Sequence, residues 1–593
     1  MGTTEKTDHG PEADTPDLDR SVDRRGFVRG TLAAAALAGL PSSLTAQGGG
    51  RGADTPPPPP RPLGQGDPPA MVFQPYPGGT GAYLEKIARE RGREAFERAR
   101  FSVEGWKGPV PTSEDEIAYL PAHRLAALIQ ARKISAVQLT DIYLNRIKRL
   151  DPQLLCAVSI LEGQAREAAQ QADAEIKSGR YRGPLHGIPW GIKDLFAVRG
   201  TKTTWGSKAH QDQVIDVDSE VYTRLHDAGA ILIAKLATGL FAQGDQWYRG
   251  QTKNPWNLTQ GASGSSAGPG SATAAGCVAF GIGTETQGSI VSPTIRNGLS
   301  ALRPTFGRVS RYGAMVLAWS MDKAGPMCRT VEDCAMVFNT IHGADEKDPA
   351  TVTAPFRFDR KVDWSKLRIG YDVGNGTPNN GAPQAVIDKL KELGAQLKPM
   401  PARPSSQGIS GLGVESAAAF DSYIATLPPQ YVDSVLAATG RGGRGGPGAT
   451  TPGGTPTGAA TPDTGRRGGG GGGGGRGPGG DDSPGSAVSR FGRGRTAPAL
   501  DFMQSQRRRY LLIHEMAAVM KDFDMYISGN GDVGLTNQTG HPAVVFPYRM
   551  SDGANSQPVC TTIIGALFAD DVILSVANAY QRATNWHAQH PKL

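Results

Sequence analysis

The chain has 593 residues, a formal net charge of +7 and five cysteines. Its 79 glycines and 44 prolines gather mainly in the first 80 residues and in residues 439–500. The rest, roughly 400 residues, is ample for one large core. Because no C-x-x-C pair occurs, a zinc site or disulfide framework is not expected, and free buried thiols are the default. Sequence alone leaves open whether Cys328 and Cys334 pair.

The charge does not indicate a nucleic-acid partner. Arginines in a glycine background, as in residues 439–500, can touch nucleic acid or anionic surfaces. The globular part is near neutral, so we expect that stretch to be a solvated disordered insert. No metal or organic cofactor is implied.

The N-terminus has the pattern of an export signal. Arg24 and Arg25 precede an apolar run, residues 31–40, and small residues follow near Ala46. This arrangement predicts a twin-arginine signal peptide over residues 1–46 and export to a bacterial periplasm, although a chance basic-then-apolar stretch is the alternative. The run is too short to span a bilayer, so no stable membrane span is expected after cleavage. Whether the signal is cleaved or kept as an anchor stays open. Residues 47–80 are expected to be a disordered Pro/Gly-rich leader.

Helical and strand patterns alternate along the globular part. Apolar residues at three- and four-residue spacing predict helices over 114–150, broken at Pro121 and at 133–135. Further helices are expected at 161–178, 221–228, 504–524 and 570–587. Short apolar runs predict buried strands within 183–200 and at 230–236, 525–529, 543–547 and 561–565. This alternation predicts an α/β fold, with one domain over 81–593 interrupted by the 439–500 insert.

Residues 260–293 consist almost throughout of small side chains. We expect two Gly/Ser loops around a small-residue helix, and their backbone N–H groups could bind an oxyanion. A serine nucleophile needs a base, and neither loop contains histidine. Lys193 lies in the apolar stretch GIPWGIKDLF, where burial would lower its pKa and make it a neutral base. The alternative is a structural glycine turn with a surface lysine.

Seven segments together resemble the amidase signature family: PLHGIPWGIKD, SGSSAG, GTETQGS, LRPTFGRVSR, MDKAGPMCRTVEDCA, LTNQTGHPAVVFP and WHAQHP. They follow the family's order and approximate spacing. The resemblance implies a single domain with a mixed β-sheet flanked by helices. The segment ETQGSIVSP is most similar to peptide-amidase-type members, and the glutaminase component of glutamyl-tRNA amidotransferase has a similar core.

The resemblance also implies a Ser–Ser–Lys triad. Lys193 matches the family's lysine, Ser289 its nucleophile, and Ser265 the bridging serine on a cis peptide bond, with Ser263 and Ser266 as nearby alternatives. Ser266 resembles the family's supporting serine, and Glu285 is expected to brace the nucleophile loop. The implied oxyanion donors are the backbone N–H groups of Thr286, Gln287, Gly288 and Ser289.

Four positions depart from the family's pattern: Ala267, Pro269, Gln287 and Val291. The first two remove no triad group. Gln287 replaces a glycine and could narrow the oxyanion pocket. Val291 replaces an arginine found in many members, which argues against a carboxylate-rich substrate.

Weaker candidates surround this site. Asp194 and His186, beside Lys193, are expected to be structural. Glu415 and Tyr423 are candidates for the substrate side.

Three functions remain in view. The first is an exported amidohydrolase acting on a linear small-molecule or peptide amide through an acyl-enzyme. The second is the glutaminase subunit of a tRNA-dependent amidotransferase, which the export signal argues against. The third is a catalytically weak amide-binding protein. The substrate, the oligomeric state and the role of the insert stay open.

Overall fold

The computed structural model describes residue 76 and residues 78–374, 381–406, 409, 411–425, 494–553 and 556–593. The expected signal peptide, most of the expected leader and most of the expected insert lie outside these residues. No helix within them is both long and apolar enough to cross a membrane. Tyr76, inside the range assigned to the leader, is buried and donates a hydrogen bond to the carbonyl of Phe306.

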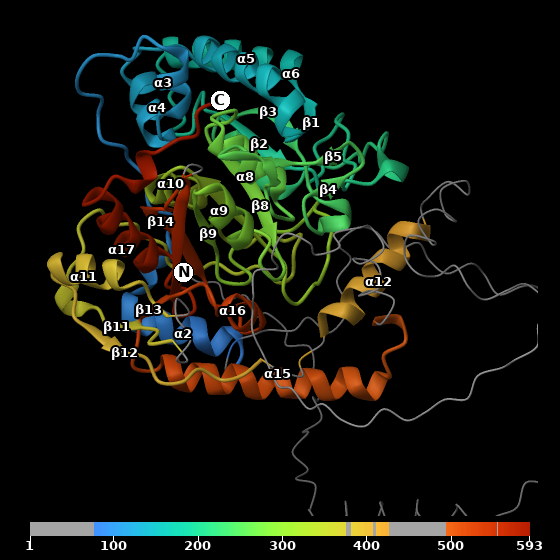
Figure 1. Cartoon of the computed structure of the whole chain (residues 1–593), viewed down its shortest axis with the longest axis vertical. Helices are drawn as coiled ribbons and strands as arrows, with labels where there is room; N and C mark the ends of the chain where they lie inside the picture. Colours follow the sequence, from blue (N-terminus) through green and yellow to red (C-terminus); the bar gives the residue numbers. More distant parts are fainter. Residues whose placement is uncertain are drawn as a thin grey trace, which may run out of the picture. The chain divides into compact units, whose positions relative to one another are not determined.

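One mixed sheet of eleven strands organises the described chain (Figure 1). From edge to edge its strands are β1 (Ala157–Ile160), β3 (Ile231–Leu236), β2 (Pro189–Lys193), β8 (Gly281–Glu285), β10 (Lys323–Cys328), β9 (Ser300–Arg303), β14 (Ala543–Met550), β15 (Pro558–Gly565), β13 (Met525–Ser528), β11 (Ile369–Tyr371) and β12 (Leu397–Pro399). Strands β3, β2 and β8 are parallel neighbours, as are β13, β11 and β12, and the remaining pairs are antiparallel. Two small hairpins lie outside it, β4 (Gln246–Trp247) with β5 (Gly250–Gln251), and β6 (Lys253–Asn254) with β7 (Asn257–Gly261).

Helices flank this sheet. They are α2 (Thr80–Arg91), α3 (Glu114–Tyr119), α4 (Ala122–Gln130), α5 (Ala136–Leu154), α6 (Glu162–Lys177), α7 (Glu220–Asp227), α8 (Ala267–Ala274), α9 (Val291–Asn297), α10 (Val331–Ile341), α11 (Gln384–Glu392), α12 (Gly411–Ala425), α15 (Ala499–Met520), α16 (Val533–Gln538) and α17 (Asp570–Arg582). The predicted α/β fold is confirmed, including the division of 114–154 into three helices.

Two boundaries differ from the sequence expectation. Residues 281–285, expected as a loop, form strand β8, because β2 and β10 offer hydrogen-bonding partners on both of its sides. Local composition is a weak guide where such pairing is available. The last residues assigned to the insert belong to the described chain, and Ala499 already begins α15, the long orange helix along the lower edge of Figure 1.

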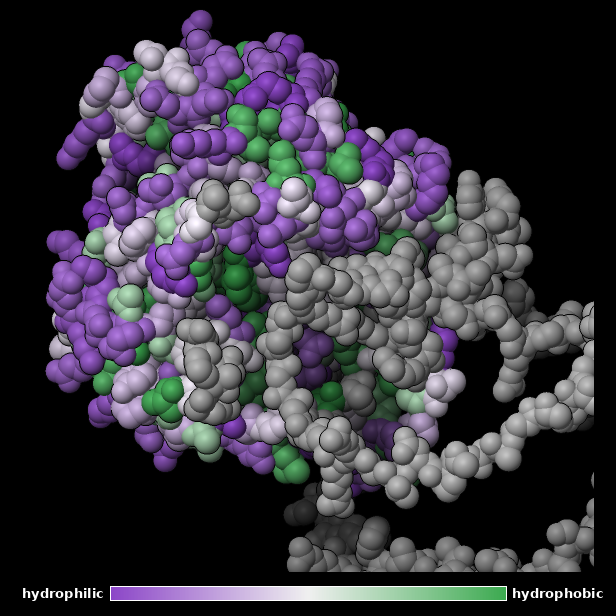
Figure 2. Space-filling view, in the orientation of Figure 1, coloured by the Kyte–Doolittle hydropathy of each residue, from purple (hydrophilic) through white to green (hydrophobic). Residues whose placement is uncertain are grey.

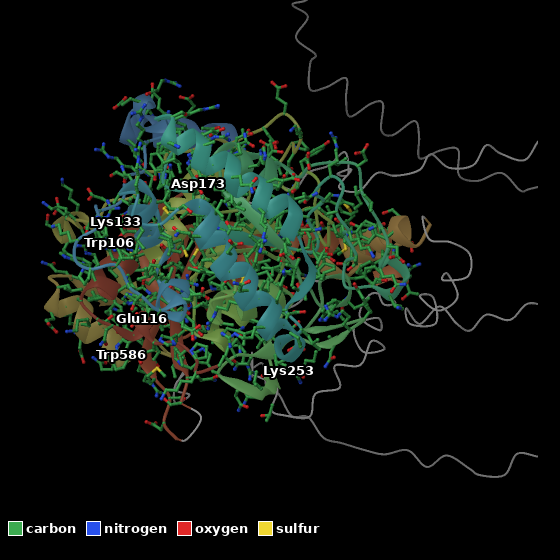
Figure 3. All side chains as sticks on the ribbon, turned by 90° about the horizontal axis from the view of Figure 1, so that it is seen from above. Trp106, Glu116, Lys133, Asp173, Lys253 and Trp586 are labelled. Carbon is green, nitrogen blue, oxygen red and sulfur yellow. The ribbon has the colours of Figure 1, made fainter. Side chains whose placement is uncertain are left out.

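Helices α5 and α6 pack side by side along the upper edge of Figure 1. The side chain of Ser135 caps α5, and Asp173 of α6, labelled in Figure 3, accepts hydrogen bonds from the N–H groups of Ala136 (2.7 Å) and Val137 (3.1 Å). A carboxylate at a helix N-terminus satisfies free N–H groups and interacts favourably with the helix dipole. These contacts fix the helix pair beside β1 and β3.

Helix α8 consists of small residues because it is buried throughout and lies close to backbone on several sides. A Cβ on Gly268 would lie 2.3 Å from the nitrogen of Ala237 and 2.6 Å from the carbonyl oxygen of Cys156. The hydroxyl of Ser271 donates to the carbonyl of Lys253, a residue labelled in Figure 3, at 2.7 Å. The small residues therefore set how closely the start of α8 approaches the sheet.

The five cysteines are all free and buried, so Cys328 and Cys334 are not paired. The described surface is mostly hydrophilic in the view of Figure 2, where hydrophobic side chains become visible in a hollow near the middle of the face.

We predict that Gly268→Ala destabilises the protein by about 1–3 kcal/mol, because the added methyl group overlaps backbone that cannot move away. Gly163 is a matched control, since it is also the second residue of a helix but has no atom within 4 Å of its Cβ position. Gly163→Ala should leave the free energy of unfolding unchanged or slightly raised. Denaturant unfolding of both variants measures this; equal stabilities would show that α8 can shift.

Candidate active site

Lys193 is the last residue of β2, and every residue of that strand is buried. Its Nζ lies 2.8 Å from Ser265 Oγ, 3.1 Å from Ser266 Oγ and 2.8 Å from Thr284 Oγ1. Three hydroxyl groups thus surround one amine at the end of the central parallel strands. The surface-lysine alternative is excluded, because Lys193 is fully buried.

Burial lowers the pKa of Lys193 to about 7, and the negative charges of Asp322 and Glu285 oppose this shift. Among the described residues, no carboxylate forms an ion pair with Lys193. The adjacent Asp194 instead pairs with Lys235 at 3.1 Å, and both of these side chains are fully buried. A large fraction of Lys193 is therefore the neutral amine at physiological pH.

Ser265 follows a cis peptide bond from Gly264, as the family resemblance implies. Gly264 lies so close to Gly244 that a Cβ would be 1.9 Å from the Gly244 carbonyl oxygen, so only glycine fits there. Ser263, the other alternative for the bridging role, takes a left-handed conformation, and its N–H donates to Asp245 at 3.0 Å. Of the three serines, Ser265 and Ser266 are the ones that contact Lys193.

Ser266 joins the two serine-containing loops. Its backbone N–H donates to the carbonyl of Ser289 at 3.2 Å, which places Ser265 and Ser289 on adjoining segments. Its hydroxyl donates to the Thr284 carbonyl (3.1 Å) and accepts from the Thr284 N–H (3.2 Å). These contacts agree with the supporting role expected for Ser266.

The nucleophile loop leads from β8 to α9. Gly288 has a φ of +114°, which favours glycine, and Ser289 beside it is half-buried. Within the described chain, the backbone N–H groups of residues 286–289 donate to no protein acceptor. They are therefore free to bind a developing negative charge, as expected of oxyanion donors.

Glu285 braces this loop from below. One oxygen, Oε2, accepts from the N–H groups of Ile290 and Val291, both at 2.8 Å. The other accepts from Arg303 (3.1 Å) and Asn537 (2.7 Å). Burial alone would raise the pKa of Glu285, but Arg303 and these hydrogen bonds hold it below its usual value. The carboxylate is charged and fixed in place.

The departures from the family pattern fall outside the group of hydroxyls around Lys193. Gln287 is exposed, and its amide lies near Gly534 of α16. Val291 is buried with Val545 and Cys560, so no charge stands at that position. Ala267 and Pro269 lie in the buried helix α8.

Sequence reasoning missed several residues that hold this site together. Thr284 contacts Lys193, Asp322 accepts a 2.6 Å hydrogen bond from Thr286 Oγ1, and Lys235 neutralises Asp194. Asp322 lies in the segment MDKAGP, which contributes to the family resemblance without indicating a role for the carboxylate. No spacing rule shows which hydroxyl or carboxylate it meets across the sheet.

A loop formed by residues 315–322 borders the site. The side chain of Glu415 in α12 holds the N–H and hydroxyl of Ser320, and Arg509 of α15 also binds Ser320. Tyr423 bonds to both backbone groups of Val316. Glu415 and Tyr423, proposed for the substrate side, are thus buried side chains that fix this loop.

Apolar side chains pack around the same loop. Leu195, two residues after Lys193, belongs to this cluster together with Trp205, Phe241, Met315, Leu317, Phe420 and Tyr423. One border of the site is therefore apolar and aromatic. Within the described residues, no group of three or more His, Cys, Asp or Glu is placed to hold a metal ion.

Comparison with known proteins agrees with this geometry. The amidase family profile matches residues 138–439. The GatA-type component of the glutamyl-tRNA(Gln) amidotransferase of Methylococcus capsulatus is 31% identical over 501 residues, covering 79% of this chain and 97% of that protein.

Solved structures show the same fold. The peptide amidase of Stenotrophomonas maltophilia has a TM-score of 0.63 and 26% identity, covering 79% of this chain and 98% of that one. An amidase family protein of Bacillus anthracis has a TM-score of 0.64 and 24% identity, covering 89% and 99%. With its matched profile, its full-length relatives and its lysine–serine geometry, the chain belongs to the amidase family.

Proposed function

We propose that this protein is an exported amidase that hydrolyses a linear carboxylic or peptide amide through Ser289, Ser265 and Lys193. The observation that carries the proposal is the contact of a fully buried Lys193 with Ser265 Oγ at 2.8 Å. A neutral lysine can accept a proton from a serine, whereas a charged lysine cannot. The resemblance assigns Ser289 as the nucleophile on the adjoining loop.

The acylation step follows from these positions. Ser289 Oγ attacks the amide carbonyl, its proton passes to Ser265, and the proton of Ser265 passes to Lys193. The free N–H groups of residues 286–289 bind the oxyanion. The C–N bond then breaks as the leaving nitrogen takes a proton back through Ser265, leaving an acyl ester on Ser289. Water attacks the ester with the same proton path, releasing the acid.

The surroundings favour an uncharged, apolar acyl group. Val291 gives the site no cation at the position where many members carry arginine, and the bordering cluster is apolar and aromatic. A carboxylate-bearing acyl group would lose water without gaining a partner there. C-terminally amidated peptides and aryl or aliphatic amides are the substrates that we favour.

The glutaminase component of an amidotransferase is the second candidate, and the 31% identity to a protein of that name supports it. The signal-like segment with Arg24 and Arg25 argues against it, because tRNA charging is cytosolic. Glutamine hydrolysis that depends on a copurifying partner protein would favour this alternative.

The triad is tested by ammonia release from amidated peptides, aliphatic and aryl amides, and glutamine. Ser289→Ala and Lys193→Ala should each lower kcat/KM by about 10²–10⁴-fold or more, because nucleophile and base act as a unit. Ser263→Ala, in the same loop but without a contact to Lys193, is the matched control and should keep most of the activity. Activity that survives Ser289→Ala contradicts the assignment; an inert but amide-binding wild type would favour a binding protein instead.

The pH dependence should report Lys193. Its neutral form is the active one, so kcat/KM should fall about tenfold for each pH unit below a midpoint near 7 and level off above it. Residual activity of Lys193→Ala should show no such midpoint. A wild-type profile that is flat from pH 5 to 8 would exclude Lys193 as the base.

Export is tested by fusing residues 1–60 to a folded reporter enzyme in a bacterium with a twin-arginine pathway. The reporter should reach the periplasm, and replacing Arg24 and Arg25 by lysine should retain most of it in the cytoplasm. A reporter that stays inside with the native arginines would refute the proposed localisation.

A further inference from the structure

Asp322 connects the oxyanion loop to the loop bordering the site. It directly precedes β10, whose first residue pairs with Glu285, so Asp322 lies opposite Thr286. Its Oδ1 accepts the Thr286 hydroxyl at 2.6 Å, and its Oδ2 accepts the N–H groups of Leu317 (2.7 Å) and Ala318 (3.1 Å). With only 8% of the residue exposed, this carboxylate is a fixed internal link.

Asp322 and Lys193 are on the same side of the sheet. Side chains alternate along a strand, so Thr284 and Thr286 project to one face of β8 and Glu285 to the other. Lys193 Nζ contacts Thr284 Oγ1, and Asp322 contacts Thr286 Oγ1. The two threonines therefore connect the amine to the carboxylate.

The charge of Asp322 is not neutralised by an ion pair within the described chain. Glu285, the other negative charge near Lys193, already has Arg303, and Asp194 already has Lys235. Asp322 has hydrogen bonds alone, and among charges it most strongly opposes the lowering of the Lys193 pKa by burial. Burial raises the pKa of Asp322 itself, against its hydrogen bonds. Other titratable groups around Asp322 are Arg311, which pairs with Asp348, and Lys323, Glu415 and Tyr423.

We propose that Asp322 is a positioning residue for the proposed amide hydrolysis, acting on both halves of the reaction at once. Through Thr286 it fixes the loop that binds the oxyanion. Through its charge it stabilises the ammonium that forms when Lys193 accepts the proton of Ser265. In that step the O–H bond of Ser265 breaks, an N–H bond forms on Lys193, and Ser265 takes the proton of Ser289. The new positive charge is buried, and Asp322 is the unneutralised opposite charge available to it.

The test measures how fast a fluorophosphonate probe phosphonylates Ser289 as a function of pH. This reaction forms an O–P bond and releases fluoride, so it reports activation of Ser289 without knowledge of the amide substrate. Wild type should show an acid limb with a midpoint near 7. Asp322→Asn should lower the plateau rate by about 10–100-fold and move the midpoint down by about one pH unit, because the charge that favours the ammonium is gone.

Thr286→Val is the matched control, because it removes the hydrogen bond to the loop but keeps the charge. It should slow labelling while leaving the midpoint at the wild-type value. Asp322→Ser removes the charge with a hydroxyl that can donate or accept, so it serves where Asp322→Asn does not fold; circular dichroism and thermal melts establish folding.

Two outcomes overturn the proposal. A folded Asp322→Asn or Asp322→Ser variant with the wild-type midpoint would show that Asp322 only holds the loop. Labelling of the wild type that Ser289→Ala does not abolish would instead refute the proposed nucleophile, and the role of Asp322 with it. The first result leaves the proposed function intact, so the two failures are distinguishable.

Discussion

The site depends on the removal of one lysine from water. Lys193 ends a strand buried on both sides, and desolvation makes its amine a base near neutral pH without help from histidine. Every other feature of the site either creates that burial or adapts to it. The small residues of α8 allow close approach to the sheet, and glycines at 244 and 264 let the first serine loop reach the amine.

The surrounding charges are arranged so that this lysine stays unpaired. Isolated buried charges are costly, and the structure compensates most of them locally. Asp194 has Lys235, and Glu285 has Arg303 together with three N–H donors. Because these carboxylates are already occupied, they do not form the ion pair that would keep Lys193 permanently protonated. The network thus has an electrostatic role in addition to holding the nucleophile loop.

Much of this arrangement could be predicted from sequence, for identifiable reasons. Helices such as α5 have a strong apolar period, and the apolar setting of Lys193 indicated its burial directly. The choice of Ser265 and Ser289 came from family resemblance, since composition alone did not rank the serines. Strand β8 and the contacts of Thr284 and Asp322 were missed, because they depend on which strands become neighbours. Glu415 was assigned to the wrong surface for the same reason.

The proton path and the walls around it come from different parts of the chain. Lys193, the serines and the oxyanion loop are confined to residues 193–289, whereas the loop at 315–322 is held by α12 and α15, far later in the sequence. Mutations in the later segments can therefore reshape the border of the site while the reactive groups keep their geometry. Over evolutionary time, such a division lets a lineage change which amides it accepts without rebuilding its chemistry.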